Sequence, residues 1–249
     1  MAVPFENQRS EPSDLRPVKI SIEHISSGVW QRLLDATAFR SEYMRKEFFR
    51  KIDDLEKLRT DAEYNTGSIA ASSAWLLFSA AFYFRPKRVL EIGTFIGKSA
   101  LSIALGCDAA GEPCELHTCD NSNSIELPPV TESKIFQYKK QTSTQMLNVI
   151  SMSGNKRPFD FAHFDGRIQP ADLPLLARIL DKNSVIALDD YAGVEKGVAN
   201  IFMLRSSGLY NSHVIIPPCT QSILDRAGLI DKPKTALLVP TSLLEISPQ

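Results

Sequence analysis

The sequence predicts an α/β fold in which helices cover both faces of a mainly parallel β-sheet. Two observations favour this class. From residue 88 onward, short apolar segments alternate with helical stretches, as they do in proteins built from β-α-β units. The chain also has 249 residues, of which 43% are hydrophobic and 23% are charged, so it is long enough to bury a sizeable core without disulfide bonds.

Charge and cysteine usage argue against several other classes of protein. The 28 lysine and arginine residues nearly balance 29 aspartate and glutamate residues, which gives no sign of a nucleic-acid-coating protein or of a polybasic membrane protein. The four cysteines contain no C-x-x-C pair, so they do not indicate a zinc site and are typical of free thiols in a reducing compartment. The first residues also lack the apolar core of a secretory signal. We therefore expect a cytoplasmic protein with no membrane or nucleic-acid partner.

Residues 1–60 are expected to form a polar tail and a helical cap, followed by the sheet domain at residues 61–249. The first 20 residues are polar and include three prolines. Residues 27–59 then carry apolar side chains at helical spacing within a highly charged segment. Such helices could cap a site or build a homodimer contact, and a solvated helical hairpin explains the pattern equally well.

The uncharged segment 68–84 is expected to be a helix buried against the sheet. Its 17 residues are at the lower limit of what can span a bilayer, and four of them are serines. Basic residues and a strand-like segment follow directly. A buried helix therefore explains this segment better than a membrane span does.

The alternation after residue 88 places the remaining elements. None of the five main strands contains a proline, which would remove a hydrogen bond from the sheet. The segments expected as strands are 88–92, 114–119, 134–139, 159–164 and 184–188, with late strands at 213–217 and 235–240. The segments expected as helices are 97–109, 142–151, 170–180 and 193–207.

Acidic residues lie at the ends of four of these strands. They are Glu91 in the first, Asp120 at the second, Asp165 at the fourth, and Asp189 with Asp190 at the fifth. One such residue is readily explained as a helix cap. Ligands of doubly wound sheets bind beyond the carboxyl ends of the strands, so four acidic ends on one edge indicate a site.

The most specific motif is VLEIGTFIGKS at residues 89–99. Gly93 and Gly97 flank a strand-to-helix turn, where missing side chains let a ligand approach the backbone. The E-x-G-x-x-x-G spacing differs from the G-x-G-x-x-G of dinucleotide-binding enzymes, which disfavours a nicotinamide-dependent oxidoreductase. Glu91 suits a ligand with an ammonium group, and Asp120 could accept hydrogen bonds from ribose hydroxyls. An ordinary tight turn and a helix cap are the alternatives.

With these motifs the chain resembles the class I S-adenosylmethionine-dependent methyltransferases. VLEIGTFIGKS looks like their first motif, and HTCD, which ends at Asp120, looks like their second-strand acid. FDFAHFDG and SVIALDDY narrow the resemblance to O-methyltransferases related to the catechol, caffeoyl-CoA and macrocin-type enzymes. The resemblance covers residues 60–240 and implies a Rossmann-like seven-stranded sheet whose last strand is antiparallel, with extra N-terminal helices.

The resemblance also implies which residues bind S-adenosylmethionine. In the first motif and the second strand these are Glu91, Gly93, Thr94, Gly97, Ser99 and Asp120. Weaker candidates are Asn65, Thr66 and Gly67 before the uncharged helix, Thr142 and Ser143 after the third strand, and Asp165 and Arg167 after the fourth.

A Mg²⁺ ion is the second cofactor that the resemblance implies. Asp165, Asp189 and Asp190 would hold it, because hard divalent cations prefer oxygen ligands. The metal would lower the pKa of an acceptor hydroxyl, with Asp165 and Asp190 as the catalytic residues. The alternative is that Asp190 caps the next helix and Asp189 only hydrogen-bonds nearby.

One departure concerns the general base. Relatives often place Lys or His three residues after the strand-4 acid, where this chain has Ile168. Arg167 stays protonated, and His163, inside the strand, is more typical of a satisfied core residue. The base is therefore unassigned, with Asp165, Asp190 and water as candidates.

These features together predict a Mg²⁺-assisted O-methyltransferase that acts on a hydroxyl of a small molecule. The alternative is a binding or regulatory protein on the same fold that keeps the cofactor without turnover. Ile168 at the usual position of the base is the main support for that alternative.

Overall fold

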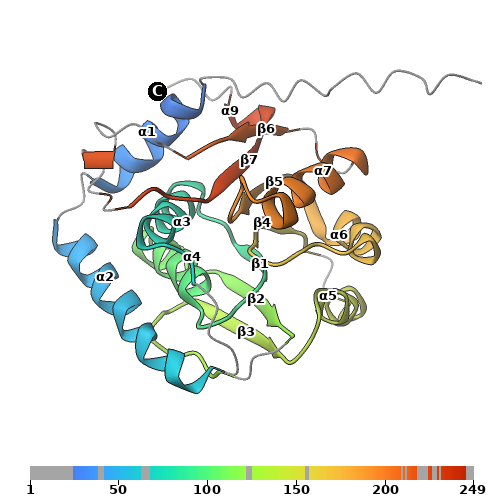
Figure 1. The fold of residues 1–249 in the computed structure, drawn as a ribbon, viewed down its shortest axis with the longest axis horizontal. Helices are drawn as coiled ribbons and strands as arrows, with labels where there is room; N and C mark the ends of the chain where they lie inside the picture. The colour runs from blue at the N-terminus through green and yellow to red at the C-terminus, as the bar shows by residue number, and fades with distance from the viewer. Residues whose placement is uncertain are drawn as a thin grey trace, which may run out of the picture.

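The fold is a seven-stranded sheet between two layers of helices, as Figure 1 shows. The computed structural model describes residues 25–38, 42–62, 68–121, 125–154, 157–208, 210, 212–217, 224–225, 229 and 231–244. The candidate residues Asn65, Thr66 and Gly67 lie outside these ranges, as does Cys219.

The sheet has the order β3-β2-β1-β4-β5-β7-β6. Its strands are β1 Arg88–Ile92, β2 Glu115–Asp120, β3 Lys134–Lys139, β4 Phe159–Phe164, β5 Leu180–Leu188, β6 Ser212–Ile215 and β7 Ala236–Pro240. Strand β7 runs antiparallel to both of its neighbours, and the other neighbouring pairs are parallel. The expected fold class, including the antiparallel last strand, is confirmed.

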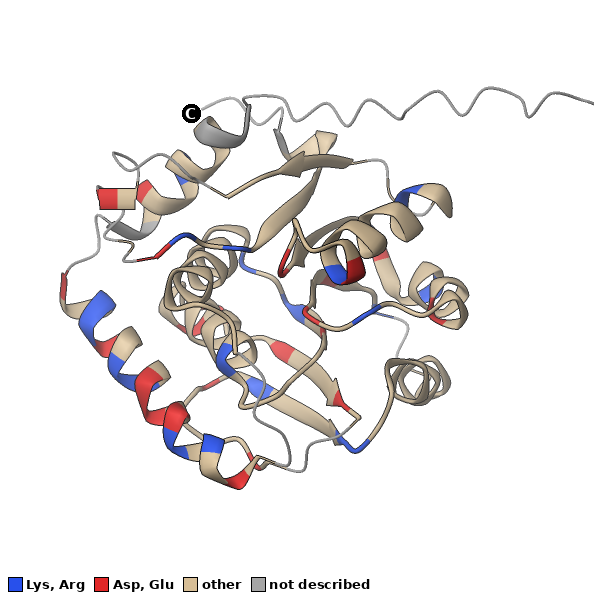
Figure 2. Cartoon of the chain, viewed as in Figure 1, with Lys and Arg blue, Asp and Glu red and all other residues tan. Residues whose placement is uncertain are grey.

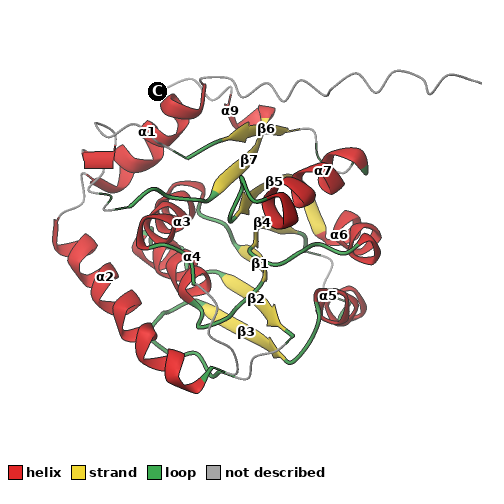
Figure 3. Ribbon diagram, viewed as in Figure 1, coloured by secondary structure: helices red, strands yellow, loops and turns green. Residues whose placement is uncertain are grey.

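Helices occupy the segments expected from the sequence and one further short segment after the last strand (Figure 3). They are α1 Ile25–Ala38, α2 Glu42–Leu55, α3 Ala71–Phe84, α4 Lys98–Ala109, α5 Ser143–Met152, α6 Leu173–Ile179, α7 Ala199–Ser206 and α9 Thr241–Leu244. Two short 3₁₀ helices, η1 Glu56–Asp61 and η2 Pro170–Asp172, and the π-helical turn η3 Val194–Val198 adjoin them. The sequence did not predict the π-helical geometry at the start of the 193–207 segment.

Alternate residues of the central strands enter two separate cores. Val89 and Phe161 pack with helices α3 and α4, whereas Leu90 and Ala162 pack with helices α5, α6 and α7. Because both faces are covered, the central strands carry apolar residues on both faces instead of alternating with exposed polar residues, and Glu91 and His163 are buried exceptions. This arrangement leaves the ends of the sheet as the places where polar groups can gather.

Helix α3 confirms the interpretation of the uncharged segment as a buried helix. Eleven residues in a row, Ser72–Phe82, are buried, because α3 lies between the sheet, α4 and the N-terminal helices. Its approach to α4 is close at Gly106, where an added Cβ would lie 2.4 Å from the carbonyl oxygen of Phe78. Among the described residues, no helix is long and apolar enough to cross a membrane.

Helices α1 and α2 pack onto α3 and belong to the same core. The indole nitrogen of Trp30 donates a hydrogen bond to the Ile216 carbonyl oxygen (2.7 Å), and the Phe48 ring lies 5.1 Å from the ring of Trp75. Charged residues occupy the remaining surface of α2 (Figure 2). The pattern of residues 27–59 therefore reflects one apolar face that packs on the domain, rather than a freely solvated hairpin.

Candidate active site

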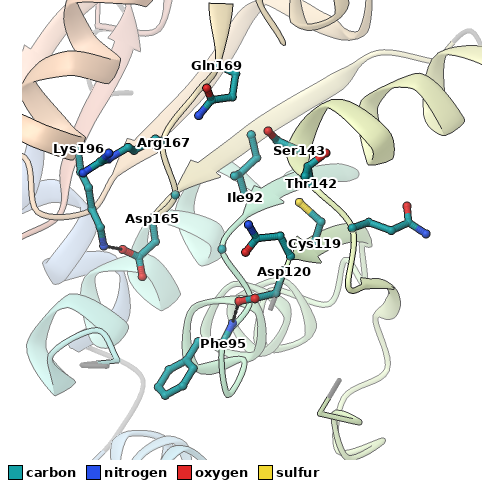
Figure 4. Close-up of a pocket in the computed structure, with 14 residues that line it drawn as sticks. Ile92, Phe95, Cys119, Asp120, Thr142, Ser143, Asp165, Arg167, Gln169 and Lys196 are labelled. Atoms are coloured by element: carbon teal, nitrogen blue, oxygen red, sulfur yellow. Dashed lines mark hydrogen bonds and ion pairs between the residues drawn. The ribbon is translucent and has the colours of Figure 1, made fainter. Parts of the chain in front are cut away.

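A cavity of about 420 Å³ lies beyond the carboxyl ends of β1, β2 and β4 (Figure 4). This is the edge at which the sequence places its acidic strand ends. The residues that form the walls are Ile92, Gly93 and Phe95 at the end of β1, Cys119–Asn121 at the end of β2, Gln141–Ser143 at the start of α5, Asp165, Gly166, Arg167 and Gln169 after β4, and Lys196.

The turn between β1 and α4 forms one wall of the cavity. Gly93 adopts a φ of 103°, and an added Cβ would lie 3.0 Å from the backbone nitrogen of Gly166, so a side chain there would be both strained and crowded. Gly97 has a φ of 80° at the N-cap of α4, but an added Cβ would meet the Leu127 side chain. Gly93 therefore lets this turn pack against the loop after β4 and lines the cavity, whereas Gly97 shapes the turn without lining the cavity.

Asp120 connects the end of β2 to this turn. One of its carboxylate oxygens, Oδ2, accepts a hydrogen bond from the backbone N–H of Phe95 (2.9 Å), and the residue is only 9% exposed. The Asp120 carboxylate thus holds the turn in shape and stands on the cavity wall at the same time. The role of Asp120 as a ribose-binding acid stays a prediction.

Glu91 lies beneath the cavity wall rather than on it. Its carboxylate accepts a hydrogen bond from the Thr118 hydroxyl (2.6 Å) and pairs with Nδ1 of His163 (3.0 Å). The side chains of Glu91 and His163 are both fully buried. Glu91 therefore has buried protein partners in place of the ligand ammonium group that the sequence suggested, and His163 has no access to a substrate.

The Glu91–His163 pair also determines the charge on the imidazole. Burial alone would lower the pKa of His163, but the hydrogen bond and the negative charge of Glu91, with Asp165 and Asp189 nearby, raise it above its ordinary value. Glu91 therefore favours the protonated form of His163 inside the domain. Its second ring nitrogen, Nε2, is buried and has no hydrogen-bond partner among the described residues.

We expect the melting temperature to fall as the pH rises above about 6.5, the ordinary pKa of histidine. A folded pKa above this value means that the contribution of His163 is fully present below the unfolded pKa and is lost as the pH passes the folded pKa. Thermal melts of the wild type between pH 6 and pH 9 measure this slope. Glu91→Gln should flatten it, and a wild-type melting temperature that stays constant over this range would contradict the assignment.

The other residues expected to bind the cofactor surround the cavity in two groups. Thr142 and Ser143 line it directly at the start of α5, where Thr142 forms a capping box with Gln145 and the Ser143 hydroxyl donates to Asp172 (2.7 Å). Thr94 and Ser99 lie together around a narrow space that also reaches Asp165.

The N-terminal helical region contacts the first-motif turn through a charged network. Glu56 in η1 pairs with Arg59 (2.8 Å) and with Lys98 at the start of α4 (2.7 Å). The Arg59 and Lys98 partners lower the pKa of Glu56 to about 2. The Arg59 guanidinium also lies over the Phe95 ring, 5.3 Å from its centroid.

The carboxylates after β4 and β5 have separate partners. Asp165 lines the cavity, and its Oδ1 forms an ion pair with Nζ of Lys196 (2.9 Å). Asp189 is 8% exposed and accepts a hydrogen bond from the Thr235 hydroxyl (2.8 Å). The Asp190 carboxylate lies against Gly193, where an added Cβ would be 2.4 Å from Oδ2.

This arrangement does not fit the Mg²⁺ site that the sequence predicts. Of the three carboxylates, Asp165 alone lines the cavity, and it already faces the Lys196 ammonium group. Within the described part of the chain, no group of three or more His, Cys, Asp or Glu side chains is placed to hold a metal ion. The ligand set of Asp165, Asp189 and Asp190 therefore stays a prediction that these contacts do not support, because a lysine occupies the position beside Asp165.

Sequence reasoning missed Lys196 and several neutral wall residues, including Gln141 and Gln169. Lys196 lies 31 residues from its partner Asp165, and no motif spacing connects the two. Ile168, at the usual position of the base, is 2% exposed and packs into the core of α6 and α7. Arg167 also lines the cavity and pairs with Glu195.

Comparison with known proteins is consistent with this geometry. Residues 90–191 match the family model of a methyltransferase domain. No curated protein matches the sequence. Solved structures of similar fold include an O-methyltransferase from Bacillus cereus in complex with SAH, which shares 12% identity and a TM-score of 0.53 over 76% of this chain and 90% of that chain.

Two further structures share the fold. Cofactor-bound Rv0187 from MTB has 16% identity and a TM-score of 0.51 over 84% of this chain and 94% of its own. The O-methyltransferase TomG from Streptomyces achromogenes, involved in tomaymycin synthesis and solved with SAM, has 17% identity and a TM-score of 0.50 over 76% and 89%. At these identities the three structures support the fold alone.

Proposed function

We propose that this chain is a methyltransferase of the class I, S-adenosylmethionine-dependent fold and that it transfers a methyl group to a hydroxyl of a small molecule. One observation carries the proposal. A single cavity is lined by Asp120 and the Gly93 turn, at the ends of β2 and β1, and by the Asp165–Lys196 pair beyond the neighbouring β4. A methyl donor held by the first pair of groups would meet an acceptor held by the second.

The donor half of the cavity is assigned to S-adenosylmethionine. Asp120 would accept hydrogen bonds from the ribose hydroxyls, and the turn at Gly93 would admit the cofactor close to the backbone. Thr142 and Ser143 would lie near the adenine. Asn65 and Gly67, outside the described residues, remain proposed contacts of the methionine part.

The chemistry that this arrangement supplies is mainly positioning. A cavity that orients the acceptor oxygen in line with the sulfonium methyl removes much of the entropic cost of a bimolecular reaction. The acceptor hydroxyl must also lose its proton, and Asp165 is the carboxylate on the acceptor wall. Because the residues do not fit Mg²⁺, we assign no step to a metal. A homodimer, a cytoplasmic location and the absence of nucleic-acid partners stay predictions from the sequence.

Calorimetric titration with S-adenosylhomocysteine, followed by an assay of S-adenosylmethionine consumption with a panel of hydroxylated acceptors, tests this function. We expect saturable binding at one site and turnover of at least one acceptor. Failure of S-adenosylhomocysteine to bind would contradict the assignment of the cavity. Tight binding without turnover across the panel would favour the regulatory alternative, which the buried Ile168 supports.

A further inference from the structure

A lysine ammonium group lies in the part of the cavity where we propose that the methyl acceptor binds. Nζ of Lys196 is 2.9 Å from Oδ1 of Asp165, and 43% of the Lys196 side chain is exposed, so the ammonium group can contact both the carboxylate and a bound molecule. Figure 4 shows the two side chains pointing toward each other, Lys196 from the turn η3 and Asp165 from the loop after β4. No other lysine lines this cavity among the described residues.

The backbone around Lys196 holds this position. Residues Val194–Val198 form a π-helical turn, closed by a hydrogen bond from the Val198 N–H to the Gly193 carbonyl oxygen (3.1 Å). The turn packs so closely on the end of β5 that an added Cβ at Gly197 would lie 2.4 Å from Cα of Tyr191. Such turns are frequent at functional sites, where they redirect one side chain.

A second ion pair fixes the same turn to the same loop. Glu195 pairs with Arg167, two residues after Asp165. The turn η3 and the loop after β4 are therefore joined by two adjacent ion pairs, Glu195–Arg167 at the rim and Lys196–Asp165 at the cavity. This double connection argues that Lys196 is positioned by the fold rather than by its own free rotation.

The surrounding charges favour a cation at this point. Asp165, Asp189 and Asp190 all follow β4 and β5, and burial with the charge of Asp165 raises the pKa of Asp189. Burial would lower the pKa of Lys196, but Asp165, and more weakly Asp189 and Asp190, raise it. The Lys196 ammonium group thus lies among carboxylates that would otherwise repel one another, 2.9 Å from Asp165 Oδ1.

We infer that Lys196 is the resident cation of the acceptor site, which binds and polarises the acceptor oxygen and makes methyl transfer independent of divalent metal. This inference rests on the proposed function. The Lys196 ammonium group would donate a hydrogen bond to the acceptor oxygen and stabilise negative charge that develops on it. Lys196 remains an ammonium group throughout.

The step balances with the groups present. The O–H bond of the acceptor breaks, and its proton passes to the Asp165 carboxylate. The oxygen then forms a bond to the methyl carbon, while the carbon–sulfur bond breaks and its electron pair stays on sulfur, which leaves S-adenosylhomocysteine. The proton returns from Asp165 to solvent when the products leave.

This arrangement also has a consequence for the class of acceptor. A divalent cation can bind two neighbouring oxygens at once, whereas one ammonium group donates single hydrogen bonds. We therefore expect acceptors with a single hydroxyl, as well as vicinal diols, to be accepted by this site.

The activity test compares Lys196→Met with the wild type in buffer containing EDTA. Loss of one charged donor at the reacting oxygen should lower kcat/KM for the acceptor by about 100-fold or more, with S-adenosylhomocysteine affinity changed by less than about threefold. The control is Lys182→Met, because Lys182 is an exposed lysine near the opposite end of β5 and should behave as the wild type. Full activity in Lys196→Met, or loss of wild-type activity in EDTA, would overturn the inference.

A second measurement does not depend on knowing the acceptor. Thermal melts of the wild type with MnCl₂ and with EDTA should give the same melting temperature. An occupied metal site at a hundredfold excess over its Kd would instead raise it by about 5–10 °C. A rise that Asp165→Asn abolishes would refute Lys196 as the resident cation. Failure of S-adenosylhomocysteine to bind would refute the proposed function. The melts with MnCl₂ would still show whether a metal ion binds beside Asp165.

Discussion

Replacing Glu91 by alanine should lower the free energy of unfolding by about 3–5 kcal/mol, the cost of removing one partner from a buried ion pair. His163 would lose the hydrogen bond to Nδ1 at a site where both side chains are fully buried, and the Thr118 hydroxyl would lose its acceptor. In a domain of this size the melting temperature should fall by about 10 °C or more. Chemical denaturation followed by circular dichroism measures the change.

Glu91→Gln is the matched control for this prediction. Glutamine keeps an oxygen acceptor and nearly the same volume, and a neutral His163 can donate to it, so most of the stability should remain. If Glu91→Ala instead keeps the wild-type stability but loses S-adenosylhomocysteine binding, Glu91 is a cofactor ligand, as its place in the first motif suggested. The variant thus separates a structural role from a binding role.

Asp120→Ala should weaken S-adenosylhomocysteine binding by more than tenfold, or about 1.4 kcal/mol, in isothermal titration calorimetry. Two effects add in this variant. The ribose hydroxyls would lose an acceptor, and the N–H of Phe95 would lose the carboxylate that holds the turn (2.9 Å). Because that hydrogen bond is buried, we also expect a loss of stability of about 1–2 kcal/mol, which the sequence alone did not indicate.

Asp120→Asn distinguishes the two effects. The asparagine side-chain oxygen can still accept from Phe95, so the turn should keep its shape and the protein its stability. Affinity for S-adenosylhomocysteine should then fall less than in the alanine variant. If both variants bind as tightly as the wild type, Asp120 is a turn residue and the ribose assignment is wrong.

The order of elements could be read from the sequence because it depends on local pattern. Strands β1, β3 and β4 begin and end at the expected residues, since each is a short apolar segment between turn residues or charges. Strand β5 begins earlier than expected, at Leu180, because its polar first residues continue the pairing with β4 across an irregular register. Polar residues at the start of a strand give no periodic signal.

Part of the candidate site could also be predicted from the sequence. Gly93, Asp120, Thr142, Ser143, Asp165 and Arg167 all line the cavity. Parallel strands place their carboxyl ends at one edge, so residues that follow successive strands meet there whatever the details of packing. Glu91 and Gly97 belong to the same motif, but their side-chain positions depend on His163 and Leu127, which are distant in sequence.

The sequence by itself determined the α/β class, the edge of the sheet that carries the site and the methyltransferase resemblance, because strand order and strand ends follow from local hydrophobic pattern and chain topology. The tertiary structure alone decided which charges meet. Lys196 reaches Asp165 because a π-helical turn packs on the backbone of Tyr191, and Asp189 turns to Thr235. These contacts join residues far apart in the chain, and their geometry depends on the packing of whole elements. The sequence predicted a metal site at three acidic residues. In the fold, Asp165 pairs with a lysine, Asp189 accepts a hydrogen bond from a threonine, and Asp190 lies against a tight turn.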